Sequence, residues 1–94
     1  MDSKLFTPVK LGPLTLRNRT IRSAAFESMC PGNKPSEQLL DYHRSVAAGG
    51  VGMTTVAYAA VTQSGLSFER QLWMRPDIIP GLKHITDAIH KEGA

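Results

Sequence analysis

The side chains best suited to acid–base or nucleophilic chemistry in this 94-residue chain are Glu27, Cys30, His43, His84 and His90. Cys30 is the only cysteine, so the printed residues hold no internal disulfide and no Cys/His set with the spacing of a zinc site. We expect an ordinary reduced thiol, since no base stands at a suggestive spacing. The histidines fall in predicted helices, where packing or helix-end roles are commoner than catalysis. We therefore predict no catalytic residue and no metal ligand.

A glycine-rich stretch, Gly49-Gly50-Val51-Gly52, superficially suggests a phosphate-binding loop. A dinucleotide fingerprint lies between a strand and the following helix, where the helix N-terminus faces the phosphate. Here the glycines follow a predicted helix and precede a strand. They are better interpreted as a helix C-cap and a tight turn.

Alternating strand-like and helix-like segments must position these side chains. Residues Leu5 to Asn18 suit a small hairpin that turns at Gly12-Pro13, and Thr20 to Ala25 form a short strand candidate. Ser36 is a suitable N-cap for a helix that runs to Ala48, with Glu37 in its first turn. One face of this helix is predicted to hold Leu39, Tyr42 or His43, Val46 and Ala47.

The second half of the chain repeats the strand–helix order. Val51 to Val61 is apolar without clean alternation, which is typical of a strand buried on both faces. Thr62 to Pro76 is predicted as a long loop, and a helix over about Pro80–Lys91 carries Ile78, Leu82, Ile85 and Ile89 at spacings of three and four. We expect the strands near Ile21–Ala25 and Met53–Ala57 to be parallel neighbours, with both helices on one side.

This order predicts an α/β fold, either a doubly wound sheet or a (β/α)₈ barrel. A parallel sheet of two strands leaves edges unpaired. The fold is therefore expected to be unfinished, with apolar faces, on Ile78, Leu82, Ile85, Ile89 and the Val51–Val61 strand, that lack partners and favour self-association.

Composition excludes several classes of partner. The chain is 41% hydrophobic and 20% charged, and no apolar run of about 18 residues can span a bilayer. Its formal charge of +3 comes from cations spread along the chain among acids, which does not make a nucleic-acid-binding stripe. The opening residues show no signal-peptide pattern, so a cytoplasmic protein that binds neither nucleic acid nor membrane is expected.

Motifs along nearly the whole chain resemble, in order, the start of old-yellow-enzyme-type NADH:flavin oxidoreductases. The matching stretches are Leu5-Phe6-x-Pro8, Leu11-Gly12, Leu14-x-Leu16-x-Asn18-Arg19, Arg22-Ser23-Ala24-Ala25-Phe26-Glu27-Ser28-Met29, Tyr42, Gly49-Gly50-Val51-Gly52 and Leu82-x-x-Ile85-x-Asp87-Ala88-x-His90-x-x-Gly93-Ala94. The resemblance implies that residues 1–94 are an N-terminal fragment of an FMN-binding (β/α)₈ barrel domain: the hairpin and the first two βα units. Such barrels place their sites at the carboxyl ends of the strands.

The resemblance also implies cofactor contacts. FMN is expected to approach the backbone of Ala24, Ala25 and Phe26 and the neighbourhood of Tyr58. Where relatives have a Thr or Cys whose side chain bonds the flavin, this chain has Phe26, so that bond is lost. Glu27 would lie at the functional end of the first strand, but it could equally pair with Arg22 or Arg44.

For the intact parent, the resemblance implies an FMN-dependent NAD(P)H oxidoreductase, an ene-reductase of α,β-unsaturated carbonyl compounds or related small molecules. Groups that relatives supply from later strands are not among the printed residues. The alternative is a non-catalytic truncated fragment that does not bind flavin by itself. Asn18 and Arg19 precede the first strand, at the end of a barrel where structural roles are commoner than catalysis.

Overall fold

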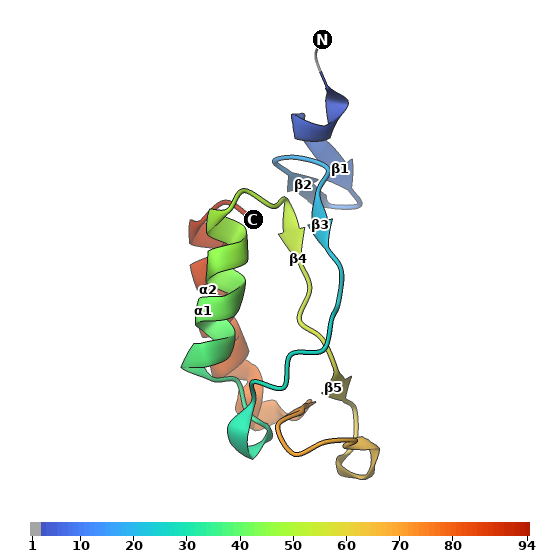
Figure 1. The fold of residues 1–94 in the computed structure, drawn as a ribbon, viewed down its shortest axis with the longest axis vertical. Coiled ribbons are helices and arrows are strands. Elements are labelled where there is room, and N and C mark those ends of the chain that lie inside the picture. Colours follow the sequence, from blue (N-terminus) through green and yellow to red (C-terminus); the bar gives the residue numbers. More distant parts are fainter. Residues whose placement is uncertain (1–2) are drawn as a thin grey trace.

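The computed structural model describes residues 3–94, which begin with a hairpin. A 3₁₀ turn over Lys4–Phe6 leads into β1 (Val9–Leu11), which pairs antiparallel with β2 (Leu14–Leu16). Gly12 turns the chain at φ 59°, a conformation that glycine adopts without a steric cost. The predicted hairpin is confirmed, and it stands at one end of the molecule (Figure 1).

A parallel strand pair follows the hairpin. β3 (Ile21–Arg22) lies beside β4 (Met53–Thr54), with Ile21 opposite Met53. The helix α1 (Glu37–Ala48) connects them and covers one side of the pair (Figure 1). Because the strands are parallel neighbours, the predicted βαβ order is confirmed.

Local chemistry sets both ends of α1. The Ser36 hydroxyl accepts a hydrogen bond from the Leu39 amide at 3.1 Å, as an N-cap does. The helix ends at Ala48 with Gly49 as its C-cap, and Gly50 has φ 107°, so the glycine pair forms the expected cap and turn. The buried face differs in part from the predicted one. It consists of Leu39, Leu40, His43 and Ala47, whereas Tyr42 is exposed and Val46 is half-buried.

Two expectations for residues 51–76 are wrong. The single strand Val51–Val61 is instead two short strands, β4 and β5 (Ala59–Ala60), separated by residues 55–58, of which Tyr58 has φ 56°. The predicted loop contains β6 (Leu72–Trp73), which pairs parallel with β5. Strands of two residues are too short to show a periodicity. Only Gly52, Ala57 and Ala60 are buried among residues 51–61, because β4 has only β3 as a neighbour within residues 3–94.

The second helix, α2 (Ile79–Lys91), packs on α1, on the same side of the strands (Figure 1). It follows a 3₁₀ turn over Pro76–Ile78. Ile78, Ile85 and Ile89 are buried with Leu39 and Leu40 in the main core. The expectation that these isoleucines lack partners is therefore wrong, because α1 supplies the apolar surface they need.

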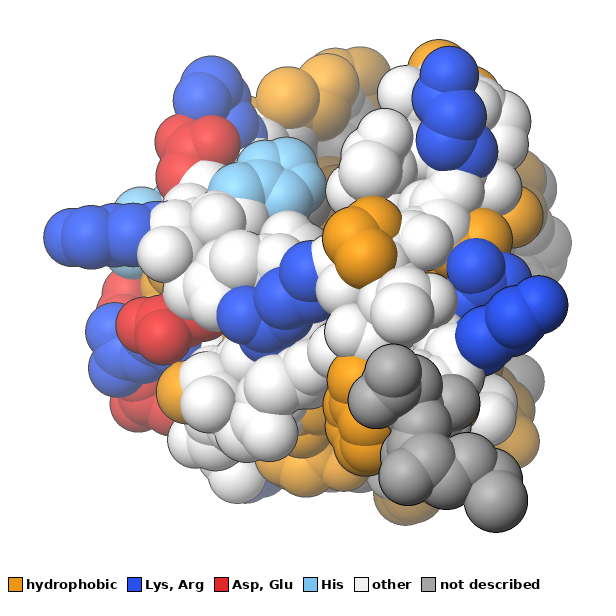
Figure 2. Space-filling model, turned by 90° about the horizontal axis from the view of Figure 1, so that it is seen from above, with side chains coloured by type: hydrophobic (Ala, Val, Ile, Leu, Met, Phe, Trp, Pro, Cys, Tyr) orange, Lys and Arg blue, Asp and Glu red, His pale blue; other side chains and the backbone are white. Residues whose placement is uncertain are grey.

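The molecule is elongated. Its radius of gyration is 14.6 Å and its extents are 50 × 22 × 22 Å, whereas a compact domain of this length would have a radius of about 12 Å. Large apolar side chains remain exposed, among them Val61 (81%) and Ile79 (62%). Viewed down the long axis, Lys and Arg side chains are dispersed and form no stripe on that face (Figure 2). No helix in the described residues is long and apolar enough to cross a membrane.

Candidate functional site

Beyond the paired residues of β3 and β4, both strands continue as extended chain toward the end of the molecule opposite the hairpin (Figure 1). On the β3 side, Ala24, Ala25 and Phe26 are exposed. Within residues 3–94, the backbone amides of these three residues form no hydrogen bond. An exposed amide pairs with water, so it remains available to a ligand. The carboxyl end of β3 therefore presents a free polar edge.

Three aromatic rings border this edge. Phe26 and Tyr58 meet edge to face with centroids 5.6 Å apart, and Phe68 lies 4.8 Å from Phe26 and 6.0 Å from Tyr58. Phe26 and Tyr58 are 63% and 56% exposed, so much of their ring surface faces solvent. Unpaired amides beside exposed rings suit a flat ligand that has polar atoms at its edge.

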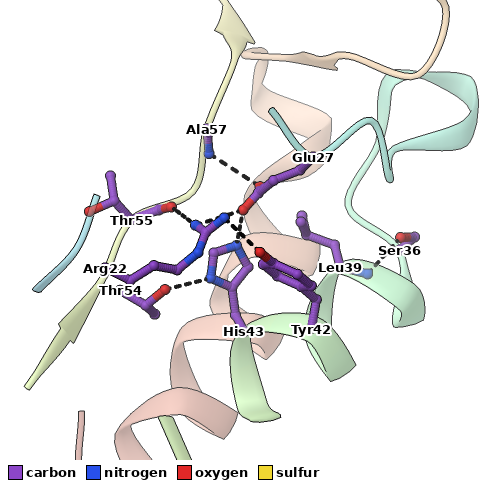
Figure 3. A network of polar contacts seen from close by, with 9 residues as sticks. All are labelled: Arg22, Glu27, Ser36, Leu39, Tyr42, His43, Thr54, Thr55 and Ala57. Carbon is purple, nitrogen blue, oxygen red and sulfur yellow. Dashed lines mark hydrogen bonds and ion pairs between the residues drawn. The ribbon is translucent and has the colours of Figure 1, made fainter. Parts of the chain in front are cut away.

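Glu27, the residue after Phe26, is the centre of a buried polar network (Figure 3). Its Oε2 is 2.9 Å from Arg22 Nη1 and 2.8 Å from His43 Nε2. Its Oε1 accepts a hydrogen bond from the Ala57 amide at 3.2 Å. The Glu27 side chain is 3% exposed, and a carboxylate so buried is stable only with such partners.

Arg22 joins this network to the strands and to α1. Its guanidinium donates to the Thr55 carbonyl at 2.7 Å and to the Tyr42 hydroxyl at 2.9 Å. It also lies over the Tyr42 ring, 4.8 Å from the centroid. The planar guanidinium thus contacts both chain segments that flank the carboxylate.

His43 completes the network from α1. Its side chain is fully buried, and burial lowers the pKa of the imidazole, with the Arg22 charge acting in the same direction and Glu27 opposing both. A neutral ring has one donor and one acceptor nitrogen. Since the Glu27 carboxylate accepts, Nε2 carries the proton and Nδ1 accepts from the Thr54 hydroxyl at 2.8 Å. Arg22 and Glu27 then balance in charge.

Cys30 lies three residues after Glu27 in the sequence. It is 4% exposed and belongs to the main core. Burial, aided by the Glu27 charge, raises the pKa of the thiol from 9.0 to about 11. A thiol of this kind is unreactive at neutral pH, which agrees with the ordinary thiol expected from the sequence.

The structure also gives the contacts of the other residues that the sequence analysis singled out. Glu27 pairs with Arg22 and not with Arg44, which pairs with Asp41 at 2.7 Å. His84 and His90 are exposed on α2. His43 has the packing position predicted for it, but its bond to Glu27 was missed, because 16 residues separate the two in the sequence. The described residues hold no group of three or more His, Cys, Asp or Glu that could bind a metal.

At the opposite end, Asn18 and its neighbours have structural contacts. The Asn18 amide donates to the Gly50 carbonyl at 2.7 Å, and its Oδ1 accepts from the Thr20 amide at 3.0 Å. Gly52 packs so close that a Cβ there would lie 2.6 Å from the Asn18 carbonyl oxygen. The structural role expected for Asn18 is thus the one its contacts support.

Comparison with curated proteins shows similarity along nearly the whole chain. A 4,4'-dithiodibutanoate disulfide reductase of Rhodococcus erythropolis is 48% identical over 90 residues, which are 96% of this chain and 22% of that protein. An NADPH dehydrogenase of Listeria welshimeri is 35% identical over 100 residues, 98% of this chain and 28% of that protein. The chain thus spans less than a third of the length of these relatives.

Solved structures show the same fold. A 2-naphthoyl-CoA reductase, in complex with 2-naphthoyl-CoA, matches with a TM-score of 0.88 at 28% identity, over 97% of this chain and 14% of that one. The old yellow enzyme from Trypanosoma cruzi matches with a TM-score of 0.83 at 26% identity, over 97% of this chain and 25% of that one. The family model of the NADH:flavin oxidoreductase / NADH oxidase family matches residues 4–94. The folded backbone thus matches solved structures, and the family model covers nearly the whole chain. The chain belongs to the NADH:flavin oxidoreductase / NADH oxidase family.

Proposed function

We propose that this chain forms the flavin-facing beginning of an FMN-dependent NAD(P)H oxidoreductase that reduces α,β-unsaturated carbonyl compounds or related acceptors. In this proposal the hairpin and the units β3–α1 and β4–α2 belong to an eight-fold (β/α) barrel. The observation that carries the proposal is the exposed edge Ala24–Phe26, whose amides are unpaired within residues 3–94 and which lies beside the rings of Phe26 and Tyr58. Family membership supports it.

The chain's own residues would bind and orient the cofactor. The small side chains of Ala24 and Ala25 leave their backbone open to close approach, so their amides and carbonyls can bond the polar edge of a flavin ring. Phe26 and Tyr58 offer ring surface beside that edge. FMN, when bound, supplies hydride transfer between the nicotinamide and the acceptor. Phe26 has no hydrogen-bonding atom in its side chain, so it excludes water there without tuning the ring by a hydrogen bond.

A second class of acceptor deserves a test of its own. The similar protein of Rhodococcus erythropolis is a reductase of the disulfide 4,4'-dithiodibutanoate. At 48% identity, that relative favours an organic disulfide as the alternative acceptor. Two electrons and two protons convert such a disulfide into two thiols, so the same hydride chemistry serves both acceptors.

FMN titration with NMR detection tests the contact surface, because chemical shifts also report weak binding. FMN would meet only one wall of its site, so we expect weak affinity. Amide shifts should change at Ala24, Ala25, Phe26 and Tyr58, and remain unchanged at Gly50 at the opposite end. Changes centred on Gly50 would refute the assigned orientation. No change up to the solubility limit of FMN would favour the alternative, a non-catalytic fragment that does not bind flavin.

An activity assay tests the catalytic half of the proposal. NADPH oxidation is followed with added FMN and either cyclohexenone or 4,4'-dithiodibutanoate, together with size-exclusion chromatography. We expect no turnover above the free-flavin background from the chain alone, because removing even one transition-state group costs roughly a hundredfold in rate. Exposed apolar residues such as Val61 and Ile79 favour self-association. Turnover by a monodisperse monomer would contradict the need for further barrel units.

A further inference from the structure

We propose that Glu27 is a positioning residue, whose carboxylate ties the carboxyl ends of β3 and β4 together and so fixes Phe26 against Tyr58. The inference rests on the proposed function only for the use of the Phe26–Tyr58 surface as a flavin contact. The contacts that carry it lie within this chain. The inference assigns to Glu27 neither contact with substrate nor proton transfer.

The first step is the bond between the two strand ends. Glu27 Oε1 accepts from the Ala57 amide at 3.2 Å. Phe26 directly precedes Glu27, and Tyr58 directly follows Ala57. The two rings are therefore attached one residue from each end of this hydrogen bond, and their centroids lie 5.6 Å apart. Loss of the bond frees both ring-bearing segments at once.

The second step is the anchoring of the carboxylate. Its other oxygen, Oε2, faces Arg22 Nη1 at 2.9 Å and His43 Nε2 at 2.8 Å. These partners come from β3 and α1, and each is held by a further contact to β4 or the chain after it: Arg22 to the Thr55 carbonyl, His43 to the Thr54 hydroxyl. Because Oε2 lies within ion-pair distance of both side chains, the orientation of the carboxylate is restrained, and Oε1 stays directed at the Ala57 amide (Figure 3).

The third step concerns the backbone beside Ala57. Tyr58 has φ 56°, in the left-handed region that side-chain-bearing residues rarely adopt. Such a conformation persists only where neighbouring contacts determine it. Within residues 3–94, the Ala57 amide has Glu27 as its hydrogen-bond partner, and this bond fixes the residue immediately before Tyr58.

Three variants of the 94-residue chain test the inference. Glu27→Ala removes the contacts of both carboxylate oxygens. Glu27→Gln keeps the shape and removes the charge, but it has a single acceptor, which cannot serve both the Ala57 amide and the side of Arg22 and His43. Asp41→Asn is the matched control, because it removes one carboxylate and one ion pair on the exposed side of α1. The readouts are hydrogen exchange of the Ala57 amide, the Phe26–Tyr58 ring contact by nuclear Overhauser effects, and the pH profile of Cys30 alkylation.

In Glu27→Ala we expect Ala57 exchange to accelerate by about tenfold or more, the ring contact to disappear, and the amide shifts of α2 to stay near their wild-type values. In Glu27→Gln the pKa of Cys30 should fall from about 11, because the Glu27 charge contributes to raising it. The Gln variant also keeps the inference testable if the Ala variant does not fold. Asp41→Asn should change none of these readouts.

Unchanged Ala57 exchange and an intact ring contact in folded Glu27→Ala or Glu27→Gln would overturn the inference. An equal loss of protection throughout α2 would also overturn it, because Glu27 would then be a general stabiliser. Failure of the proposed function can be distinguished from failure of this inference. If only the proposed function fails, the wild-type chain shows no FMN-induced shifts, but the contact between the Phe26 and Tyr58 rings still depends on Glu27.

Discussion

Arg17 provides a sharp test of how the hairpin end is held together. Its guanidinium donates to three carbonyl groups: Ala47 at 2.5 Å, Val51 at 3.0 and 3.2 Å, and Glu92 at 2.7 Å. These carbonyls belong to the end of α1, the turn before β4, and the cap of α2. One side chain thus satisfies carbonyl groups at the ends of both helices, where intrahelical partners are missing.

The perturbation is Arg17→Lys, which keeps the charge and removes the planar fork of donors. Hydrogen bonds from a charged donor contribute about 1.5–3 kcal/mol each. Lysine can retain one of the three carbonyls and the favourable helix-dipole interaction of about 0.3–1 kcal/mol. Because Arg17 is half-buried, water partly replaces the lost bonds. We therefore expect a loss of about 2–4 kcal/mol, a large part of the roughly 5–15 kcal/mol typical of a domain.

Urea unfolding followed by circular dichroism measures this loss. The matched control is Arg19→Lys, since Arg19 is exposed and its two contacts are long, both 3.4 Å. Gly93→Ala should also destabilise the chain, because Gly93 has φ 97°, which strains an alanine, and because a Cβ there would lie 2.5 Å from Arg17 Nη1 and displace the guanidinium. A change below about 0.5 kcal/mol in Arg17→Lys, equal to that of Arg19→Lys, would refute the reasoning, since surface substitutions typically stay within that range.

Three further predictions concern other buried sites. Burial lowers the pKa of His43 from 6.5 in the folded chain. The unfolded chain therefore binds the proton first as pH falls. Stability should be lost below about pH 6.5, by at most about 1.4 kcal/mol per pH unit. Urea midpoints at pH 7.5 and 5 should differ less in His43→Gln, and equal differences would contradict this. Cys30, with its pKa raised to about 11, should react slowly with iodoacetamide at pH 8 and rapidly in denaturant; fast labelling of the native chain would be the contrary result. Gly52→Ala should cost about 1–3 kcal/mol by overpacking, whereas Gly65→Ala, whose nearest new contact is 3.4 Å away, should cost clearly less in the same urea assay.

Sequence patterns predicted those elements whose signals are local. The hairpin has its Gly12 turn, α1 has its Ser36 cap, and α2 has its repeated isoleucines, so each was found with nearly correct bounds. The pair β5–β6 was missed because each strand has only two residues and its partner lies about a dozen residues away. Pairing over such a distance leaves no periodic signal in either strand.

The candidate site also has one part that the sequence could predict and one part that it could not. The strand-end position of Phe26 and Tyr58 could be predicted from the order of elements and the resemblance. The partners of Glu27 could not, because Arg22 and Arg44 were equally plausible from charge alone. Only the folded chain shows that the buried side of α1 presents His43, and not Arg44, to the carboxylate. A buried carboxylate needs several specific partners at once, and sequence spacing identifies them poorly.

The exposed amides and the buried carboxylate have one common physical cause. The β3–β4 ladder ends at the pair Arg22 and Thr54, and beyond it the two backbones no longer bond each other directly. Without a substitute, the ends would separate; the Glu27 side chain bridges them by accepting from the Ala57 amide. Because a side chain replaces the ladder, the backbone at Ala24 and Ala25 stays unpaired within residues 3–94 without loss of alignment. A ligand that bonds this edge then competes with water alone, on a surface whose geometry is already fixed.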